Sequence, residues 1–232
     1  MTGRALVGMV PSLGRTLLGS RSPARFVIEK PASAYAEALR STFTAVSLGM
    51  LDQPPKVLMV TSSLPGEGKS TTLQRLALIM AGSGERVLLI DSDLRRPTQH
   101  HLCGASRHPG LGDLLAGRQK LDDVIQAGIA PNLDFIPSGG LPGFTLGLMH
   151  GARLKALVTD LRGRYDRVIF DSPPIIGVSD ASVLASAVDG ALLLIQHRRN
   201  PAAMVERARE TGAAEVVLQW PKVSQTGQSR VA

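Results

Sequence analysis

The sequence reads TSSLPGEGKSTT from residue 61 to residue 72, and the other elements can be placed outward from this segment. A short apolar run precedes it at residues 56–60, and a stretch of periodically spaced apolar residues follows it at 73–81. This order predicts a strand, a tight turn and then a helix. A glycine-rich turn between a strand and a helix is the context in which a phosphate-binding loop works.

Individual residues of the loop suit that chemistry. Gly66 and Gly68 leave room for backbone N–H groups to surround phosphate oxygens, and a helix starting near Lys69 directs its positive dipole end there. Lys69 would reach the outer phosphates, and the Ser70 hydroxyl would bind Mg²⁺. Ser63 stands where the textual pattern has its first glycine, so a glycine–lysine loop without a nucleotide is the alternative. The residues expected to contact the nucleotide are Pro65, Gly66, Glu67, Gly68, Lys69, Ser70 and Thr71.

Carboxylates follow two further strand-like runs. In RVLLIDSDLRRP, residues 86–97, four apolar residues end in Asp91 and Asp93. In YDRVIFDSPP, residues 165–174, another apolar run ends in Asp171. The carboxyl ends of parallel strands face the same crevice, so all three carboxylates should lie beside the phosphates. Asp171 could hold Mg²⁺ through a water molecule.

The order of elements predicts an α/β fold with a doubly wound, mainly parallel sheet and helices on both faces. The 232 residues, 44% of them hydrophobic, are enough for one sizeable core. Strands are expected at 56–62, 86–91, 133–136, 167–171, 190–196 and, at the end, 214–220. Helices are expected at 32–51, as a pair within 111–127, and at 153–162, 178–188 and 201–209.

Composition narrows the class of protein. The net charge of +7 could attract a polyanion, but scattered solvated charge is the simpler interpretation because no basic stripe with interleaved aromatics accompanies it. A nucleic-acid partner is therefore not expected. The single cysteine, Cys103, suits a reducing compartment, and no apolar run approaches the roughly 20 residues that span a bilayer. Residues 1–28 carry only basic charges, which predicts a flexible basic arm that binds anionic lipid, tethers the chain or acts as a transit peptide.

Four segments together resemble the bacterial tyrosine kinases of capsule and exopolysaccharide synthesis. They are SLPGEGKST, IDSDLRRPTQH, GLGDLLAGRQKLDDVIQ at residues 110–126, and YDRVIFDSPP. These kinases are P-loop proteins related to the Min and Par partition ATPases, and the resemblance covers roughly residues 34–209. The partition ATPases have a signature lysine at the start of the loop, which residues 61–64 lack. The resemblance therefore implies a P-loop NTPase fold, ATP and Mg²⁺ as cofactors, and phosphate transfer to a tyrosine of a partner.

The resemblance also implies partners. Such kinases work with a transmembrane regulator of polysaccharide chain length, which would bring a cytoplasmic protein to the inner face of the plasma membrane, with membrane association only indirect. Their N-terminal helix carries Glu-x-x-Arg-x-x-Arg, which joins subunits into a homo-oligomer. Glu37 and Arg40 match this motif, but Phe43 replaces the last arginine. Residues 141–150 also depart from the family. Residues 221–232 contain no tyrosine, so autophosphorylation of the tail in the family manner is not expected in this polypeptide.

Residue roles follow from both lines of reasoning. The loop amides and Lys69 would stabilise the transferring phosphate, and Asp91, helped by Asp93, would accept the proton of an attacking hydroxyl. The hydroxyl belongs to tyrosine in a kinase and to water in a partition-type ATPase, and a nucleotide-gated adaptor without turnover is a third possibility. The expected domains are a basic arm at 1–31, a helix at 32–52, a P-loop domain at 53–212 and a short tail at 213–232.

Overall fold

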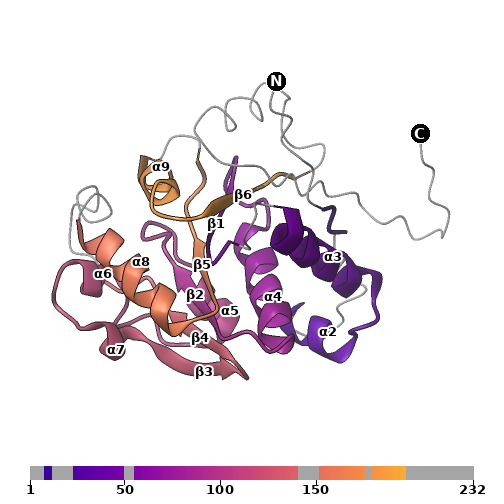
Figure 1. Ribbon diagram of the computed structural model, residues 1–232, viewed down its shortest axis with the longest axis horizontal. Coiled ribbons are helices and arrows are strands. Elements are labelled where there is room, and N and C mark those ends of the chain that lie inside the picture. The colour runs from indigo at the N-terminus through magenta and orange to yellow at the C-terminus, as the bar shows by residue number, and fades with distance from the viewer. Residues whose placement is uncertain (1–7, 12–22, 50–54, 141–151, 176–178, 197–232) are drawn as a thin grey trace.

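A computed structural model describes residues 8–11, 23–49, 55–140, 152–175 and 179–196 as one α/β unit (Figure 1). Its centre is a six-stranded sheet with the order β3-β4-β2-β5-β1-β6. Every neighbouring pair is parallel except β3 and β4, which are antiparallel. The predicted doubly wound, mainly parallel sheet is confirmed. The strands are β1 Val57–Ser62, β2 Val87–Asp91, β3 Gln126–Ala130, β4 Leu133–Ile136, β5 Arg167–Asp171 and β6 Gly190–Leu194.

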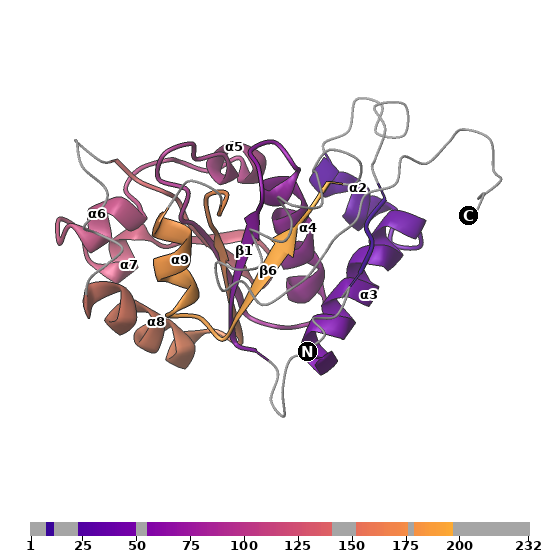
Figure 2. The same cartoon turned by 90° about the horizontal axis from the view of Figure 1, so that it is seen from above.

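Helices cover both faces of the sheet, as expected (Figure 2). Helices α2, α3 and α4 lie on one face, and α6, α8 and α9 lie on the other. The described helices are α2 Pro23–Glu29, α3 Ala34–Gly49, α4 Lys69–Gly82, α5 Gln99–Cys103, α6 Leu111–Leu115, α7 Leu121–Val124, α8 Ala152–Arg164 and α9 Ser179–Ala185. Within the described residues, none of the helices is long and apolar enough to cross a bilayer.

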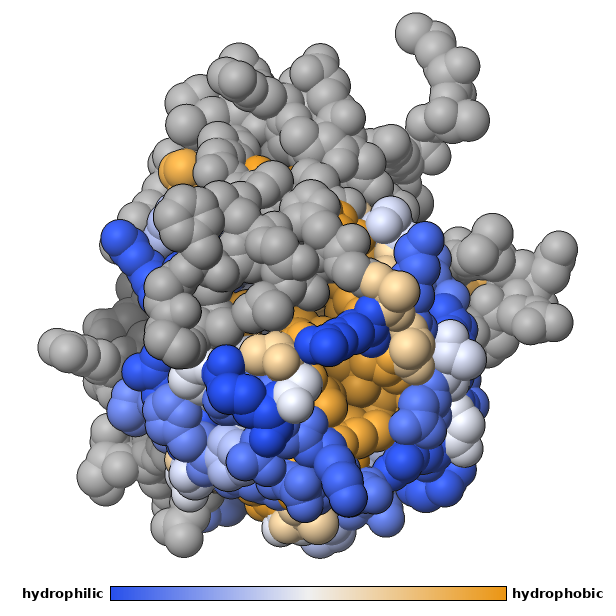
Figure 3. All heavy atoms as spheres, turned by 90° about the vertical axis from the view of Figure 1, so that its left-hand side faces the viewer, coloured by the Kyte–Doolittle hydropathy of each residue, from blue (hydrophilic) through white to orange (hydrophobic). Residues whose placement is uncertain are grey.

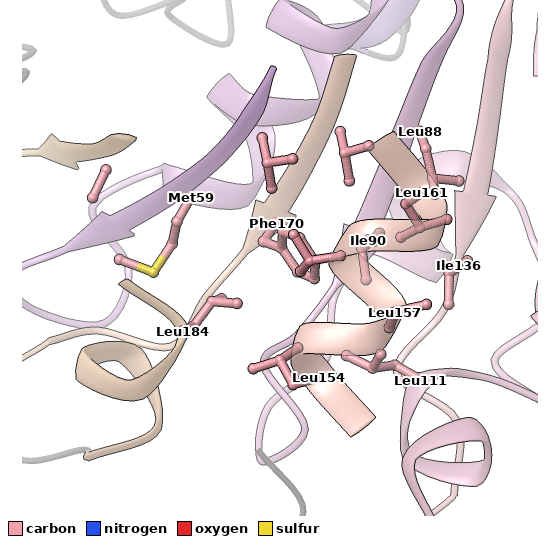
Figure 4. Packing of buried hydrophobic residues seen from close by; sticks show 14 of the residues in the cluster. Met59, Leu88, Ile90, Leu111, Ile136, Leu154, Leu157, Leu161, Phe170 and Leu184 are labelled. Carbon is pink, nitrogen blue, oxygen red and sulfur yellow. The ribbon is translucent and has the colours of Figure 1, made fainter. Parts of the chain in front are cut away.

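The core has two halves because successive strand residues point to opposite faces. Leu58 and Val60 of β1 pack on the side of α4, whereas Met59 packs on the side of α8 and α9. Figure 4 shows Met59, Phe170 and Leu157 within the second half. A strand covered on both faces is apolar throughout, and this is why the runs in β2 and β5 could be recognised from sequence.

Three expectations differ from the structure. Residues Pro23–Glu29 form helix α2, and Phe26 and Val27 are buried beside α4. The prediction of a flexible arm is therefore wrong for these residues. Residues 126–127 were expected to be helical but begin the edge strand β3. The hairpin from β3 to β4 contains Asn132 at φ 61°, and only local turn chemistry encodes such a turn. The spacing of apolar residues in 32–51 also predicts that Leu48 lies on the apolar face of that helix, yet Leu48 is 79% exposed.

Other expectations fall outside the described residues, among them the helix at 201–209, the strand at 214–220 and the unusual loop at 141–150. The pair Glu37 and Arg40 is described. Their side chains form an ion pair on the exposed side of α3, with 2.8 Å between Arg40 Nη2 and Glu37 Oε2. That contact is the ordinary one for residues three apart on a helix, and a role in subunit assembly stays a prediction.

A hollow in the surface lies between α6, α7 and α8 (Figure 3). It has a volume of about 400 Å³, and its lining includes Leu114, Leu121 and Leu157. Arg153 also lines it and donates from Nη1 to the Leu115 carbonyl at 2.8 Å.

The packing of α3 on α4 includes a buried polar contact that can be tested. Arg75 Nη1 donates to the Tyr35 hydroxyl, and the guanidinium lies 4.9 Å from the centre of the Tyr35 ring; both residues are buried. Tyr35→Phe keeps the ring but leaves the buried guanidinium without its acceptor. We expect the free energy of unfolding to fall by about 1–2 kcal/mol in urea titrations. An unchanged unfolding midpoint would show that the hydroxyl contributes nothing to the packing of α3.

Candidate active site

The loop after β1 adopts the conformation that its glycines permit. Gly66 has φ 79° and Gly68 has φ 86°, both in the left-handed region that other residues rarely adopt. Gly68 is the N-cap of α4, and no side chain caps the first turn of the helix. The N–H groups at the start of a 14-residue helix therefore remain available to an anion.

Two side chains of the loop hold it in this conformation. The buried carboxylate of Glu67 accepts from the Leu64 amide at 2.7 Å and from the Gln196 amide, just beyond β6, at 3.0 Å. The Ser62 hydroxyl donates to the Leu64 carbonyl at 2.9 Å. The predicted contact of Glu67 with a nucleotide could thus involve only its backbone.

The loop forms one wall of a cleft of about 540 Å³ at the carboxyl ends of the strands. Asp93, Arg96 and His101 lie on other parts of the wall. Arg95 and Arg96 follow the two carboxylates in the sequence, which predicts that either arginine could neutralise phosphate charge, and Arg96 lines the cleft. The loop residues that line the cleft are Pro65, Gly66, Gly68, Lys69, Ser70 and Thr71, which are the predicted contacts without Glu67.

The structure brings the predicted lysine and carboxylates together. Asp91 and Asp171 are partners in the register of β2 and β5, and both side chains are fully buried. Lys69 Nζ forms an ion pair with Asp171 Oδ1 and lies 3.3 Å from the Ser70 hydroxyl. Lys69 thus bonds Asp171 across the site, at the base of the cleft where phosphates are expected.

Asp91 and Asp93 have different surroundings. Asp91 accepts three backbone hydrogen bonds, from Asp93 at 3.2 Å, from Thr98 at 3.1 Å and from Gln99 at 3.0 Å. Burial, followed by the negative charge of Asp171, raises the pKa of Asp91 to about 7. Asp93 instead lines the cleft, and its Oδ1 accepts from the Arg96 amide at 3.0 Å.

Gln99, at the start of α5, is a site residue that the sequence did not single out. Its side-chain amide donates to the Ser70 carbonyl and to Asp171 Oδ2, each at 2.9 Å. The segment IDSDLRRPTQH contains this residue, but a single glutamine after a turn has no pattern that marks it as part of a site. Only the fold places it between the loop and β5.

The donor set fits a hard cation that arrives with phosphates. The Ser70 hydroxyl and the Asp171 carboxylate are the oxygen ligands that Mg²⁺ accepts. Among the described residues, no group of three or more histidine, cysteine, aspartate or glutamate side chains is placed to hold a metal ion by itself. Magnesium usually keeps several waters and takes the rest of its ligands from substrate phosphates, so few protein ligands are needed.

The raised pKa of Asp91 predicts how stability changes with pH. The folded protein keeps this proton up to about pH 7, whereas an unfolded aspartate loses it near pH 3.8. The unfolded state therefore binds fewer protons in this window, and stability falls as the pH rises. Each unit of pKa difference is worth about 1.36 kcal/mol. From pH 5 to pH 8 the wild type should lose on the order of 2 kcal/mol relative to Asp91→Asn, measured by urea unfolding. If the free energies of unfolding of the two proteins changed in parallel between pH 5 and pH 8, the raised pKa of Asp91 would be contradicted.

Comparison with known proteins identifies close relatives. A family described as an AAA domain matches residues 55–204. Tyrosine-protein kinase YwqD of Bacillus subtilis is 35% identical over 193 residues, which cover 83% of this chain and 81% of YwqD. Tyrosine-protein kinase etk of Escherichia coli is 35% identical over 86% of this chain, but the match covers only 26% of etk. The match thus spans only about a quarter of the length of several curated relatives.

Solved structures give the same result. The kinase domain of Escherichia coli tyrosine kinase ETK superposes with a TM-score of 0.87 at 28% identity, covering 99% of this chain and 94% of that domain. The septum site-determining protein MinD of Pyrococcus horikoshii, complexed with Mg-ADP, has a TM-score of 0.58 at 21% identity, covering 75% of this chain and 72% of MinD. The second likeness supports the P-loop fold alone, so the partition ATPases are the more distant group.

Proposed function

The chain belongs to the bacterial tyrosine kinases, and from that premise we propose that it transfers the γ-phosphate of MgATP to a tyrosine of a partner protein in capsule or exopolysaccharide synthesis. One observation supports this most directly. The uncapped start of α4, Lys69 and Asp93 all line one cleft. These are a phosphate cradle, a cation and a carboxylate that a substrate hydroxyl can reach.

The reaction needs charge stabilisation and a proton acceptor. The tyrosine oxygen bonds to the γ-phosphorus, the bond to the bridging oxygen breaks, and ADP leaves. Loop amides and Lys69 stabilise the negative charge of the phosphate during transfer. Ser70 would hold Mg²⁺ directly and Asp171 would hold it through water, and the cation would neutralise phosphate charge.

We place the proton acceptor differently from the sequence reasoning, which favoured Asp91 helped by Asp93. Asp93 lines the cleft, whereas Asp91 is fully buried and accepts hydrogen bonds from three backbone amides. A general base must come within hydrogen-bond reach of the proton that it takes. Asp93 therefore accepts the tyrosine proton, and Asp91 fixes the turn that carries Asp93 and Gln99.

Neither tyrosine of this sequence is placed to be the acceptor. The sequence contains two tyrosines, Tyr35 and Tyr165. The first is buried against Arg75, and the second is 8% exposed, with its hydroxyl 2.8 Å from Asp134 Oδ2. Neither hydroxyl is free to enter the cleft. The proposed partner is a membrane regulator of polysaccharide chain length, which recruits this domain. The match covers only 26% of etk, so that relative contains much sequence beyond the part similar to this chain.

Transfer of labelled γ-phosphate from ATP tests the proposal. The protein is incubated with Mg²⁺ and a tyrosine-containing peptide, and label on peptide tyrosine is the expected result. Free phosphate without labelled peptide would instead favour a partition-type ATPase. Binding of ATP with neither product, also in the presence of the cytoplasmic part of a membrane regulator, would indicate an adaptor without turnover.

A further inference from the structure

Gln99 contacts three parts of the candidate site, which are Asp91 of β2, the first turn of α4 and Asp171 of β5. Its backbone amide donates to Asp91, and its side-chain amide donates to the Ser70 carbonyl and to Asp171. These contacts reach the second and fifth strands of the sheet and the first turn of α4. The residue is fully buried, so it is part of the base of the site rather than of its rim.

The orientation of the Gln99 side-chain amide follows from its neighbours. A backbone carbonyl and a carboxylate are acceptors only, so the NH₂ group must face Ser70 and Asp171. The Gln99 Oε1 atom then points away from both, and it is buried with no hydrogen-bond partner.

The two oxygens of Asp171 have separate partners. Oδ1 is paired with Lys69, and Oδ2 accepts from Gln99. If Lys69 turns to the phosphates when nucleotide binds, Oδ1 is released, and Gln99 is left as the side chain that holds the carboxylate in place. Groups that orient metal ligands in this way commonly change metal affinity by about 10- to 100-fold when they are removed.

We infer that Gln99 is a positioning residue for magnesium: it holds Asp171 through Nε2 when Lys69 leaves. This rests on the proposed function, because it assumes that MgATP occupies the cleft. It assigns to Gln99 a role in the coupling between Mg²⁺ and nucleotide, separate from nucleotide binding itself.

The test measures that coupling without any catalytic step. ADP binding is measured by calorimetry with the whole chain, once with MgCl₂ and once with EDTA. The ratio of the two dissociation constants gives the magnesium effect. Gln99→Met keeps a side chain of similar length but cannot donate or accept. We expect the ratio to shrink at least about tenfold in this variant, while ADP binding in EDTA changes by less than about threefold.

Gln74 offers a matched control. It is a buried glutamine of α4 whose Nε2 donates to the Leu102 carbonyl of α5 at 2.6 Å, away from Asp171. Gln74→Met should disturb the packing of α5 to a similar degree and keep the wild-type ratio. If both variants lose the ratio equally, or if Gln99→Met keeps it, the inference is wrong.

Two further outcomes are distinguished. If Gln99→Met does not fold, Gln99→Asn replaces it, because its shorter side chain cannot reach both acceptors; a wild-type ratio in that variant overturns the inference. If the wild type itself binds ADP equally with and without Mg²⁺, the inference about Gln99 is wrong, whereas a wild type that does not bind ADP at all contradicts the proposed function.

Discussion

Lys69→Met is expected to lower the rate of phosphate transfer from ATP by at least about 100-fold, which is the cost of removing one group that stabilises charge in a transition state. Methionine fills a similar volume but carries no charge. The lysine lies at the first position of α4, 3.3 Å from the Ser70 hydroxyl, where the cradle of loop amides ends. The rate is measured with labelled ATP, Mg²⁺ and the tyrosine peptide.

The variant also removes the cationic partner of buried Asp171, so a loss of activity must be separated from a loss of folding. Thermal unfolding of the variant, with and without ADP, makes that separation. Lys155→Met, on the exposed side of α8, is the control for loss of one positive charge and should keep the wild-type rate. A Lys69→Met protein that is folded and transfers phosphate within about threefold of wild type would show that the loop lysine does not act on the phosphates.

The fold could be predicted from the sequence where burial on both sides leaves a clear pattern. The runs that end in Asp91 and Asp171 form central strands, and a strand covered by helices on both faces must be apolar throughout. Edge strand β3 reads QAGIA and is half exposed, so neither an apolar run nor an alternation marks it. Helix α2 was missed for a related reason: Phe26 is buried only because tertiary packing brings it to α4.

The site was predictable to the extent that backbone direction determines it. A glycine-rich turn and two strand ends had to meet at the same edge of the sheet, which is why Lys69, Asp91 and Asp171 could be grouped from sequence alone. Side-chain direction is not encoded in that way. Glu67 turns inward to the Leu64 and Gln196 amides, and Gln99 reaches Asp171 from 72 residues away in the sequence.

The difference between Asp91 and Asp93 leads to the second large effect. Asp93→Asn should lower the turnover rate for transfer by about 100-fold, because a positioned general base commonly contributes 100-fold or more. The Michaelis constant for ATP should change little, since an asparagine Oδ1 can still accept from the Arg96 amide. Initial rates at varied ATP separate the turnover rate from the Michaelis constant. Asp160→Asn, on the exposed side of α8, is the control for loss of one negative charge.

Asp91→Asn provides the contrast within the same turn. This substitution alters the acceptor of the Thr98 and Gln99 amides, so it should disturb the positions of Asp93 and Gln99 and affect ATP binding as well as turnover. Asp93→Asn should affect turnover alone. The opposite pattern, with an active Asp93→Asn protein and an Asp91→Asn protein that binds ATP normally but does not transfer phosphate, would make Asp91 the proton acceptor. In that case the buried carboxylate would have to become accessible when the nucleotide binds, and the cleft would differ between its free and loaded states.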